Sequence, residues 1–268
     1  MTTPANRRGY ETPFLTAISI MAYRQVKRFL RMRARMVMAL IQPLVWMLFF
    51  GLGWSSTLRG PMARQVLGGL SYLEFLAPGV AMMTVFGTSF FAGASVVWDR
   101  EFGFLKEVLV APASRKAIIL GRALGDSLVA IAQGLVTFAI ACALAGRVNL
   151  VGLPLLVAAM FLTALAHTSL GIAIGSLVTS MEAFQLIVNL ISMPTIFLSG
   201  TVFPLKMAPE WMKNLSMLIP LTYGVDAARS ATFGGALIPL WLDMAVLSAL
   251  ALALVLLSAK AFERATLA

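Results

Sequence analysis

Residues 75–98 read FLAPGVAMMTVFGTSFFAGASVVW, an apolar stretch without a charged side chain. A helix of about 20 such residues spans the hydrocarbon core of a bilayer, where the backbone has no water to bind. Five more stretches meet this criterion and lack the alternation of a membrane β-barrel: 36–54, 118–145, 150–178, 183–203 and 237–259. We predict an all-α polytopic membrane protein, with six transmembrane helices in a single transmembrane domain, residues 1–268.

The composition excludes several other classes of protein. Hydrophobic residues make up 60% of the chain and charged residues 12%, with a mean hydropathy of +0.89. A soluble domain carries about twice as much charge, and a disordered chain is far less apolar. The net charge of +10 lies beside the apolar spans, so it indicates membrane topology and not a nucleic-acid partner. Fifteen Lys and Arg on one side against six on the other predict that both termini are cytoplasmic.

The sequence carries none of the motifs that mark catalysis or nucleotide binding. No P-loop sequence is present, and the single histidine, His167, excludes a cluster of histidine ligands. We therefore expect no catalytic residue, no metal site and no cofactor bound by this chain. Asp126 follows Arg122 by four residues, which predicts a local ion pair. Asp243 lies inside the last span, where it could line a polar cavity or reach back to the interface.

Residues 1–35 combine a cytoplasmic tail with an amphipathic helix. Leu15, Ile18, Ala22, Val26 and Phe29 fall on one stripe of that helix, and cations lie opposite. Such a helix lies in the headgroup plane and attracts anionic membrane lipid. It serves either as an elbow that a moving bundle pushes against or as a passive anchor, and the pattern leaves both open. The candidate elbow residues are Arg24, Lys27, Arg28, Arg31 and Arg35.

The cytoplasmic loop at residues 99–116 is the first segment outside the spans with a distinctive pattern. Acids and bases crowd its start, an apolar helical face follows, and Pro112 ends the helix. A short amphipathic helix of this kind either docks into a groove on a soluble partner or simply joins two spans. The candidate contact residues are Asp99, Arg100, Glu101, Phe104, Leu105 and Glu107.

The second such segment, residues 204–223, lies outside the membrane between the fifth and sixth spans. Its prolines divide an apolar region into pieces too short to cross a bilayer. We predict a broken helix that dips back from the external surface, which is tolerated where protein or water shields its backbone. It acts either as an external gate or as a structural plug. The candidate gate residues are Phe203, Pro204, Pro209, Trp211, Pro220 and Tyr223.

These segments together resemble the permease subunits of type-2 ABC exporters, the family of drug-resistance, Nod-factor and lipid-linked polysaccharide export permeases. The resemblance covers nearly the whole chain and rests on the order of its short motifs relative to the six spans. The motifs are Phe75-Leu76-Ala77-Pro78-Gly79, Asp99-Arg100-Glu101 with Glu107 and Ala111-Pro112, Leu198-Ser199-Gly200, Phe203-Pro204, and Pro220-Leu221-Thr222-Tyr223.

The resemblance implies partners and a location. The permease would lie in the cytoplasmic membrane of a prokaryote. A cytoplasmic ABC ATPase would bind to it in two copies and hold the ATP and Mg²⁺. A second permease copy, or a homologue, would complete the transporter. Residues 99–107 would match the family's coupling helix, residues 1–35 its elbow helix, and 204–223 its re-entrant pair. The pathway would run between the two permeases, lined partly by Phe86, Phe90 and Phe197, although core or lipid packing also explains these side chains.

The leading function is therefore the permease subunit of an ATP-driven exporter of an amphipathic, drug-like or lipid-linked glycan compound. The alternatives are a non-transporting membrane scaffold and a membrane-embedded lipid-modifying enzyme, for which Arg122, Asp126 and His167 are scattered candidates. The substrate and the choice between homodimer and heterodimer stay open. Two small-xxx-small pairs, Gly121/Gly125 and Gly171/Gly175, favour packing within one bundle over dimerisation.

Overall fold

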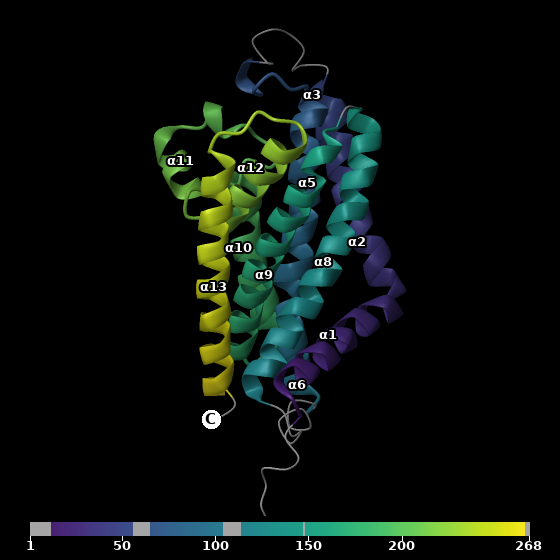
Figure 1. Ribbon diagram of the computed structural model, residues 1–268, viewed down its shortest axis with the longest axis vertical. Coiled ribbons are helices and arrows are strands. Elements are labelled where there is room, and N and C mark those ends of the chain that lie inside the picture. Colours follow the sequence, from purple (N-terminus) through teal and green to yellow (C-terminus); the bar gives the residue numbers. More distant parts are fainter. Residues whose placement is uncertain (1–11, 56–64, 104–113, 147, 266–268) are drawn as a thin grey trace, which may run out of the picture.

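The computed structural model describes residues 12–55, 65–103, 114–146 and 148–265 (Figure 1). In this part of the chain, six helical stretches are long and apolar enough to cross a membrane, which confirms the predicted fold class. They cover 36–55, 72–101, 115–145, 150–177, 181–198 and 240–264. The fifth span ends five residues before its predicted bound, and the sixth ends five residues after its own. The helix of the fifth span stops at Leu198 because Gly200 turns the backbone at a φ of +74°.

All the described elements are helical. In chain order they are α1 (Phe14–Arg31), α2 (Arg33–Trp46), the π-helical turn η2 (Met47–Leu52), α3 (Gly53–Ser55), α5 (Tyr72–Phe90), the 3₁₀ turn η3 (Phe91–Gly93), α6 (Ala94–Glu101), α8 (Arg115–Ala145), η4 (Leu150–Gly152), α9 (Leu153–Leu177), α10 (Met181–Leu198), η5 (Leu205–Met207), α11 (Glu210–Ser216), α12 (Pro220–Thr232) and α13 (Leu240–Ala265). Several begin at a serine cap; Ser71, for example, forms a capping box with Glu74.

The second span, α5 with η3 and α6, is the central one. In its most apolar window 83% of the residues are buried, whereas the fifth and sixth spans reach only 17%. It packs against α8, α9, α12 and α2, while α13 lies along one edge of the bundle and α2 along another (Figure 1). The outer helices expose many leucines and phenylalanines. Such side chains on a protein of this composition face lipid.

Glycines hold the central span tightly against α9. A Cβ at Gly171 would overlap the carbonyl oxygen of Phe90, and one at Gly93 would overlap the backbone of Gly171. Gly175 likewise faces the backbone of Gly93. The pair Gly171/Gly175 therefore serves packing within the bundle, as expected from its spacing.

Helix α1 runs obliquely across the end of the bundle that also holds α6 and the end of α13 (Figure 1). We call this the α1 end, and the opposite end the α11 end. Gly121 and Gly125 of α8 face α1, so a Cβ on Gly125 would lie 2.7 Å from the carbonyl oxygen of Ala22. The bundle-facing side of α1 carries Ala17, Met21 and Gln25, which the predicted apolar stripe did not include.

Leu15, a member of the predicted stripe, is instead 78% exposed. The physical reason is that α1 needs a narrow face for the glycines of α8 and a separate apolar face for lipid. A single stripe read from hydrophobicity alone cannot distinguish the two.

We predict that Gly171→Ala destabilises the protein, because the new methyl group meets backbone that cannot rotate away. Overpacking of this kind costs about 1–3 kcal/mol. The measurement is the thermal unfolding midpoint of the purified protein in detergent. Gly53→Ala is the matched control, since its Cβ would meet nothing within 4 Å. Equal midpoints for the two variants would contradict the close α5–α9 contact.

Candidate functional site

A cavity of about 300 Å³ lies between α2, α5, α8 and α10. Its size falls at the lower end of the range of small-molecule sites. Gly87 of α5, Gln133 of α8 and Asn189 of α10 all line it, and each lies near the middle of its span. The cavity is therefore at the depth of the bilayer centre. Its apolar wall includes Met83, Phe86, Phe90, Phe91, Val188 and Ile196.

The cavity also has polar lining residues. Thr88 donates a hydrogen bond of 2.7 Å to Oε1 of Gln133, and Thr84 is bonded to Thr137 at 3.2 Å. Gln133 is only 6% exposed, yet its amide nitrogen has no hydrogen-bond partner within the described residues. A buried amide without a partner costs about 1–3 kcal/mol. The remaining polar lining comes from Gln42, Asn189 and Ser192.

Gly87 forms an open part of the cavity wall. A Cβ placed on it would meet nothing within 4 Å, in contrast to the tightly packed glycines of the same span. A methyl group at this position would therefore displace no described part of the protein.

Two of the three aromatic residues expected along the pathway line this cavity. The rings of Phe86 and Phe90 stack with their centroids 5.4 Å apart, and each is 1% exposed. Phe197 lies elsewhere, in an aromatic cluster with Trp46 and Phe203 toward the α11 end. The role of all three in a pathway stays a prediction.

Three of the four charged residues predicted to contact an ATPase, Asp99, Arg100 and Glu101, are bound within the permease itself. Asp99 forms a buried ion pair with Arg122 of α8. Arg100 donates to the carbonyl oxygens of Ser176 and Val178, 2.7 Å each, at the end of α9. Together these contacts join α6, the last described helix before the loop at 104–113, to α8 and α9.

Glu101 extends the same junction to a further span, because its Oε1 accepts a hydrogen bond of 3.0 Å from the backbone nitrogen of Met181, the first residue of α10. The other predicted contact residues, Phe104, Leu105 and Glu107, lie outside the described residues. Their role stays a prediction.

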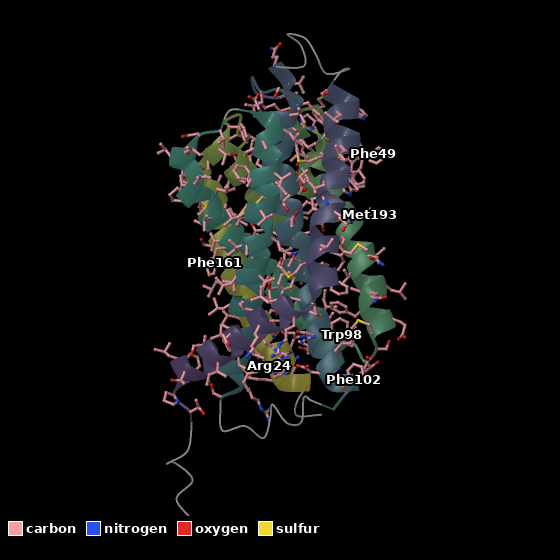
Figure 2. The ribbon with its side chains drawn as sticks, turned by 90° about the vertical axis from the view of Figure 1, so that its right-hand side faces the viewer. Arg24, Phe49, Trp98, Phe102, Phe161 and Met193 are labelled. Atoms are coloured by element: carbon pink, nitrogen blue, oxygen red, sulfur yellow. The ribbon has the colours of Figure 1, made fainter. Side chains whose placement is uncertain are left out.

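Most of the candidate elbow residues lie on α1 beside this junction, and Figure 2 shows Arg24 and Trp98 at the α1 end. The Arg28 guanidinium stacks over the Trp98 ring at 5.6 Å from its centroid. Burial lowers the pKa of Arg28, while the nearby Asp126 carboxylate acts to raise it. Lys27 lies over the Tyr23 ring. Arg31 is in the last turn of α1, and Arg35 belongs to α2.

The candidate gate residues lie at the α11 end. Pro204 and Pro209 precede η5 and α11, and Pro220 opens α12. The Tyr223 hydroxyl donates to the carbonyl oxygen of Met217 at 2.7 Å, so α12 is tied to the end of α11. Phe203 packs against Phe50 and Trp54, whereas Trp211 is mostly exposed.

A residue that the sequence patterns did not single out holds this end together. The Arg229 guanidinium of α12 donates to the carbonyl oxygens of Phe75 and Gly200, and it lies 3.8 Å from the centre of the Phe75 ring. Burial lowers the pKa of Arg229 to about 10, against the attraction of Asp226. One side chain thus joins α12, α5 and the turn after α10. Its only sequence signal is a cation in an otherwise apolar segment.

Six helices that can span a membrane, with a half-polar cavity at their mid-depth, define a polytopic membrane protein. The chain belongs to the ABC-2 type transporter family, whose model matches residues 16–233. Permeases of this family generally pair with an ABC ATPase.

Three similar proteins illustrate the family. The chain is 29% identical to the ycf38 protein of Cyanophora paradoxa, over 76% of this chain and 71% of the relative. It is 29% identical to nodulation protein J of Rhizobium leguminosarum bv. trifolii, over 73% and 72%. It is 25% identical to the inner membrane transport permease YadH of Escherichia coli K12, over 84% and 86%.

We predict that Arg122→Met and Asp99→Asn each destabilise the protein strongly, because each leaves one buried charge without its partner. Breaking a buried pair in this way costs about 3–5 kcal/mol. Arg122→Met should be the worse of the two, since Asp126 also attracts the Arg122 guanidinium. The double variant should recover part of the loss. Thermal unfolding in detergent measures all three.

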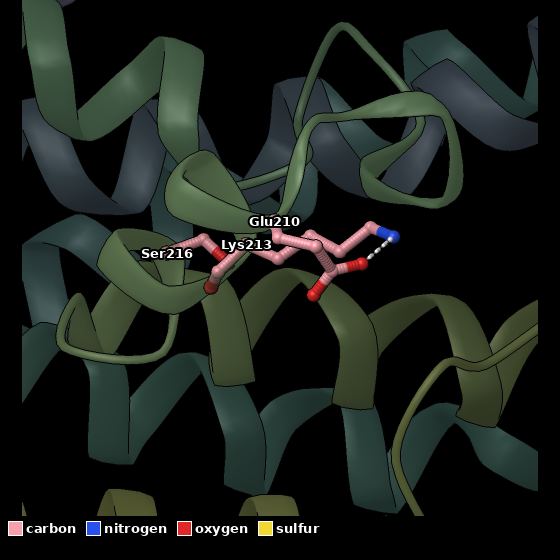
Figure 3. A network of polar contacts seen from close by, with 3 residues as sticks. All are labelled: Glu210, Lys213 and Ser216. Carbon is pink, nitrogen blue, oxygen red and sulfur yellow. Dashed lines mark hydrogen bonds and ion pairs between the residues drawn. The ribbon is translucent and has the colours of Figure 1, made fainter.

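The exposed pair of Glu210 and Lys213, 3.1 Å apart in α11, is the matched control (Figure 3). Breaking a surface pair of this kind costs at most about 1 kcal/mol. If Asp99→Asn and Glu210→Gln lowered stability equally, the central role of the Asp99–Arg122 pair would be refuted.

Proposed function

We propose that this chain is the membrane subunit of an ATP-driven exporter, which moves an amphipathic, drug-like or lipid-linked glycan compound out of the cytoplasm or the inner leaflet. A separate ATPase subunit would bind two copies per transporter and hold the ATP and Mg²⁺. The observation that carries the proposal is the combination of the family match over 16–233 with a half-polar cavity at the middle of the spans. A non-transporting scaffold would leave that cavity without a purpose.

The α1 end is the cytoplasmic side in this proposal, because the majority of Lys and Arg residues flank the spans there. The loop at 104–113 then faces the ATPase, with Phe104 and Leu105 as the apolar insert and Glu107 as the polar contact. Movement of the loop reaches the bundle through α6. Asp99, Arg100 and Glu101 connect α6 to α8, α9 and α10, so three spans would shift together.

The α11 end would close the external side of the pathway. Arg229 links α12 to α5, and Tyr223 links α12 to α11, so these short helices would move as one cap. A second permease copy, or a homologue, would cover the outer faces of α2 and α10. In the single chain, only 19% of the apolar window of the first span and 17% of that of the fifth span is buried. Membrane lipid would surround the rest.

An embedded enzyme is disfavoured by the placement of its scattered candidates. Arg122 is paired with Asp99 at the α1 end, whereas the Nδ1 atom of His167 lies 2.8 Å from the carbonyl oxygen of Thr163 inside the bundle. These side chains do not converge on a shared site.

We predict that Glu107→Lys leaves the permease folded but breaks its coupling to the ATPase. The tagged protein is purified from its native membranes in mild detergent, and co-eluting proteins and ATP hydrolysis are measured. The native chain should bring down a stoichiometric ATPase. The variant should retain at most one tenth of the ATPase that the native chain retains, or it should keep the ATPase and lose transport. Reversal of a charge at a polar contact accounts for either loss.

The control is Glu210→Lys, which makes the same charge change on an exposed residue at the α11 end. It should retain the ATPase at the native level. A stable native permease without any ATPase partner, or normal transport by Glu107→Lys, would contradict the proposed function.

A further inference from the structure

The residues that line the mid-membrane cavity indicate whether its ligand is charged or neutral. No charged side chain is present among its fourteen lining residues. Its polar groups are the amides of Gln42, Gln133 and Asn189 and the hydroxyls of Thr84, Thr88 and Ser192. All of these are neutral, and they can both donate and accept hydrogen bonds.

An unmet hydrogen-bond donor lies in the wall of the cavity. The Gln133 amide nitrogen is buried and has no partner within the described residues, while the amide oxygen already accepts from Thr88. If the amide is turned around, its nitrogen donates to Thr88 and the oxygen becomes the free group. In either orientation Gln133 offers one unused hydrogen-bonding group at the depth of the bilayer centre, where water cannot easily serve it.

Further polar groups face the same space from α10. Asn189 and Ser192 are three residues apart and therefore lie on one side of that helix. Apolar side chains line the same cavity, among them Met83, Phe86, Phe90 and Val188. A ligand that satisfies the whole cavity has an apolar body and several hydroxyl or carbonyl groups.

A charged headgroup does not fit this lining. An ion at this depth without a counter-charge pays most of its dehydration cost. Aromatic faces can hold a cation, but Phe86 and Phe90 stack on each other and are both 1% exposed. The third ring of the lining, Phe91, is partly buried and packs against Phe184 in a T-shaped contact.

Charged residues do line a separate, smaller cavity of about 20 Å³ toward the α1 end. Arg28 and Asp126 line it, and Thr88 alone is shared with the main cavity. A space of that size holds about one water molecule, so it does not extend the ligand site.

We propose that the cavity between α2, α5, α8 and α10 binds an uncharged amphipathic molecule that carries hydroxyl or carbonyl groups, and that Gln133 selects it by hydrogen bonding. The proposal deepens the proposed function by naming the class of compound that the exporter carries. It predicts discrimination against cations and anions with the same apolar body.

The test measures binding to the purified permease in lipid nanodiscs, without an ATPase. Three probes share a decyl chain: decyl glucoside is neutral and hydroxylated, decyltrimethylammonium is cationic, and decyl sulfate is anionic. Equilibrium dialysis of each labelled probe below its micelle concentration gives its affinity, and empty nanodiscs give the background of partition into lipid. The glucoside should bind saturably and at least tenfold more tightly than either ion.

Two variants locate the binding. Gln133→Leu removes the amide at similar size and should weaken glucoside binding at least tenfold; the Thr88 hydroxyl can turn to a carbonyl of its own helix. Gly87→Leu fills the open wall and should abolish saturable binding. Gly53→Leu is the matched control, because Gly53 also has nothing within 4 Å of its Cβ, but it lies in α3, away from the cavity.

Equal affinity for the charged probes would overturn the proposal, and so would glucoside binding that survives both Gln133→Leu and Gly87→Leu. If Gln133→Leu does not fold, Gly87→Leu decides, because its side chain enters open space. The assay is independent of the ATPase. If the permease binds the glucoside selectively but the pull-down finds no ATPase, the exporter function is contradicted and this inference stands. If the pull-down finds an ATPase but the three probes bind equally well, this inference is contradicted and the exporter function stands.

Discussion

The close backbone contact between the central span and α9 is the constraint on which the rest of the bundle depends. Apolar burial cannot drive helices together in lipid, so they associate through close packing between small residues. Gly93, Gly171 and Gly175 provide that packing, and it places η3 directly against α9. With this segment fixed, α6 leaves the bundle at a defined point, where its charged residues reach α8, α9 and α10.

The same span contains both the tightest packing and the open wall of the cavity. Gly93 meets the backbone of α9, whereas Gly87, less than two turns before it, faces open space. One glycine permits close helix contact, and the other leaves room for a ligand. This contrast along a single span links the rigid part of the bundle to the proposed binding site. Arg229 holds that span at the α11 end of the bundle, and Asp99 holds it at the α1 end.

The six spans were predictable because the length and hydrophobicity of a segment are local properties. The direction in which each side chain points was not, since an all-apolar helix such as α9 shows no face. Phe86 and Phe90 were expected along the pathway and line the cavity, but Gln133, Gly87 and Thr88 were overlooked. Arg122 was expected to pair with Asp126 on its own helix, and Asp126 does attract its guanidinium, but the buried ion pair of Arg122 with Asp99 on another helix was not foreseen. Contacts between helices depend on the tertiary fold, which a single sequence does not display.

If the chain is the membrane subunit of an ATP-driven exporter, as proposed, ATP binding by the ATPase must change access to the cavity between α2, α5, α8 and α10. The most direct measurement of that access is the labelling rate of Gly87→Cys by a membrane-permeant maleimide. The native Cys142, the one cysteine of the chain, is first replaced by alanine. The assay uses the complex with its co-purified ATPase, with and without ATP and vanadate. We predict that trapping the nucleotide in the ATPase changes the labelling rate several-fold. An unchanged rate in a complex that hydrolyses ATP would contradict it.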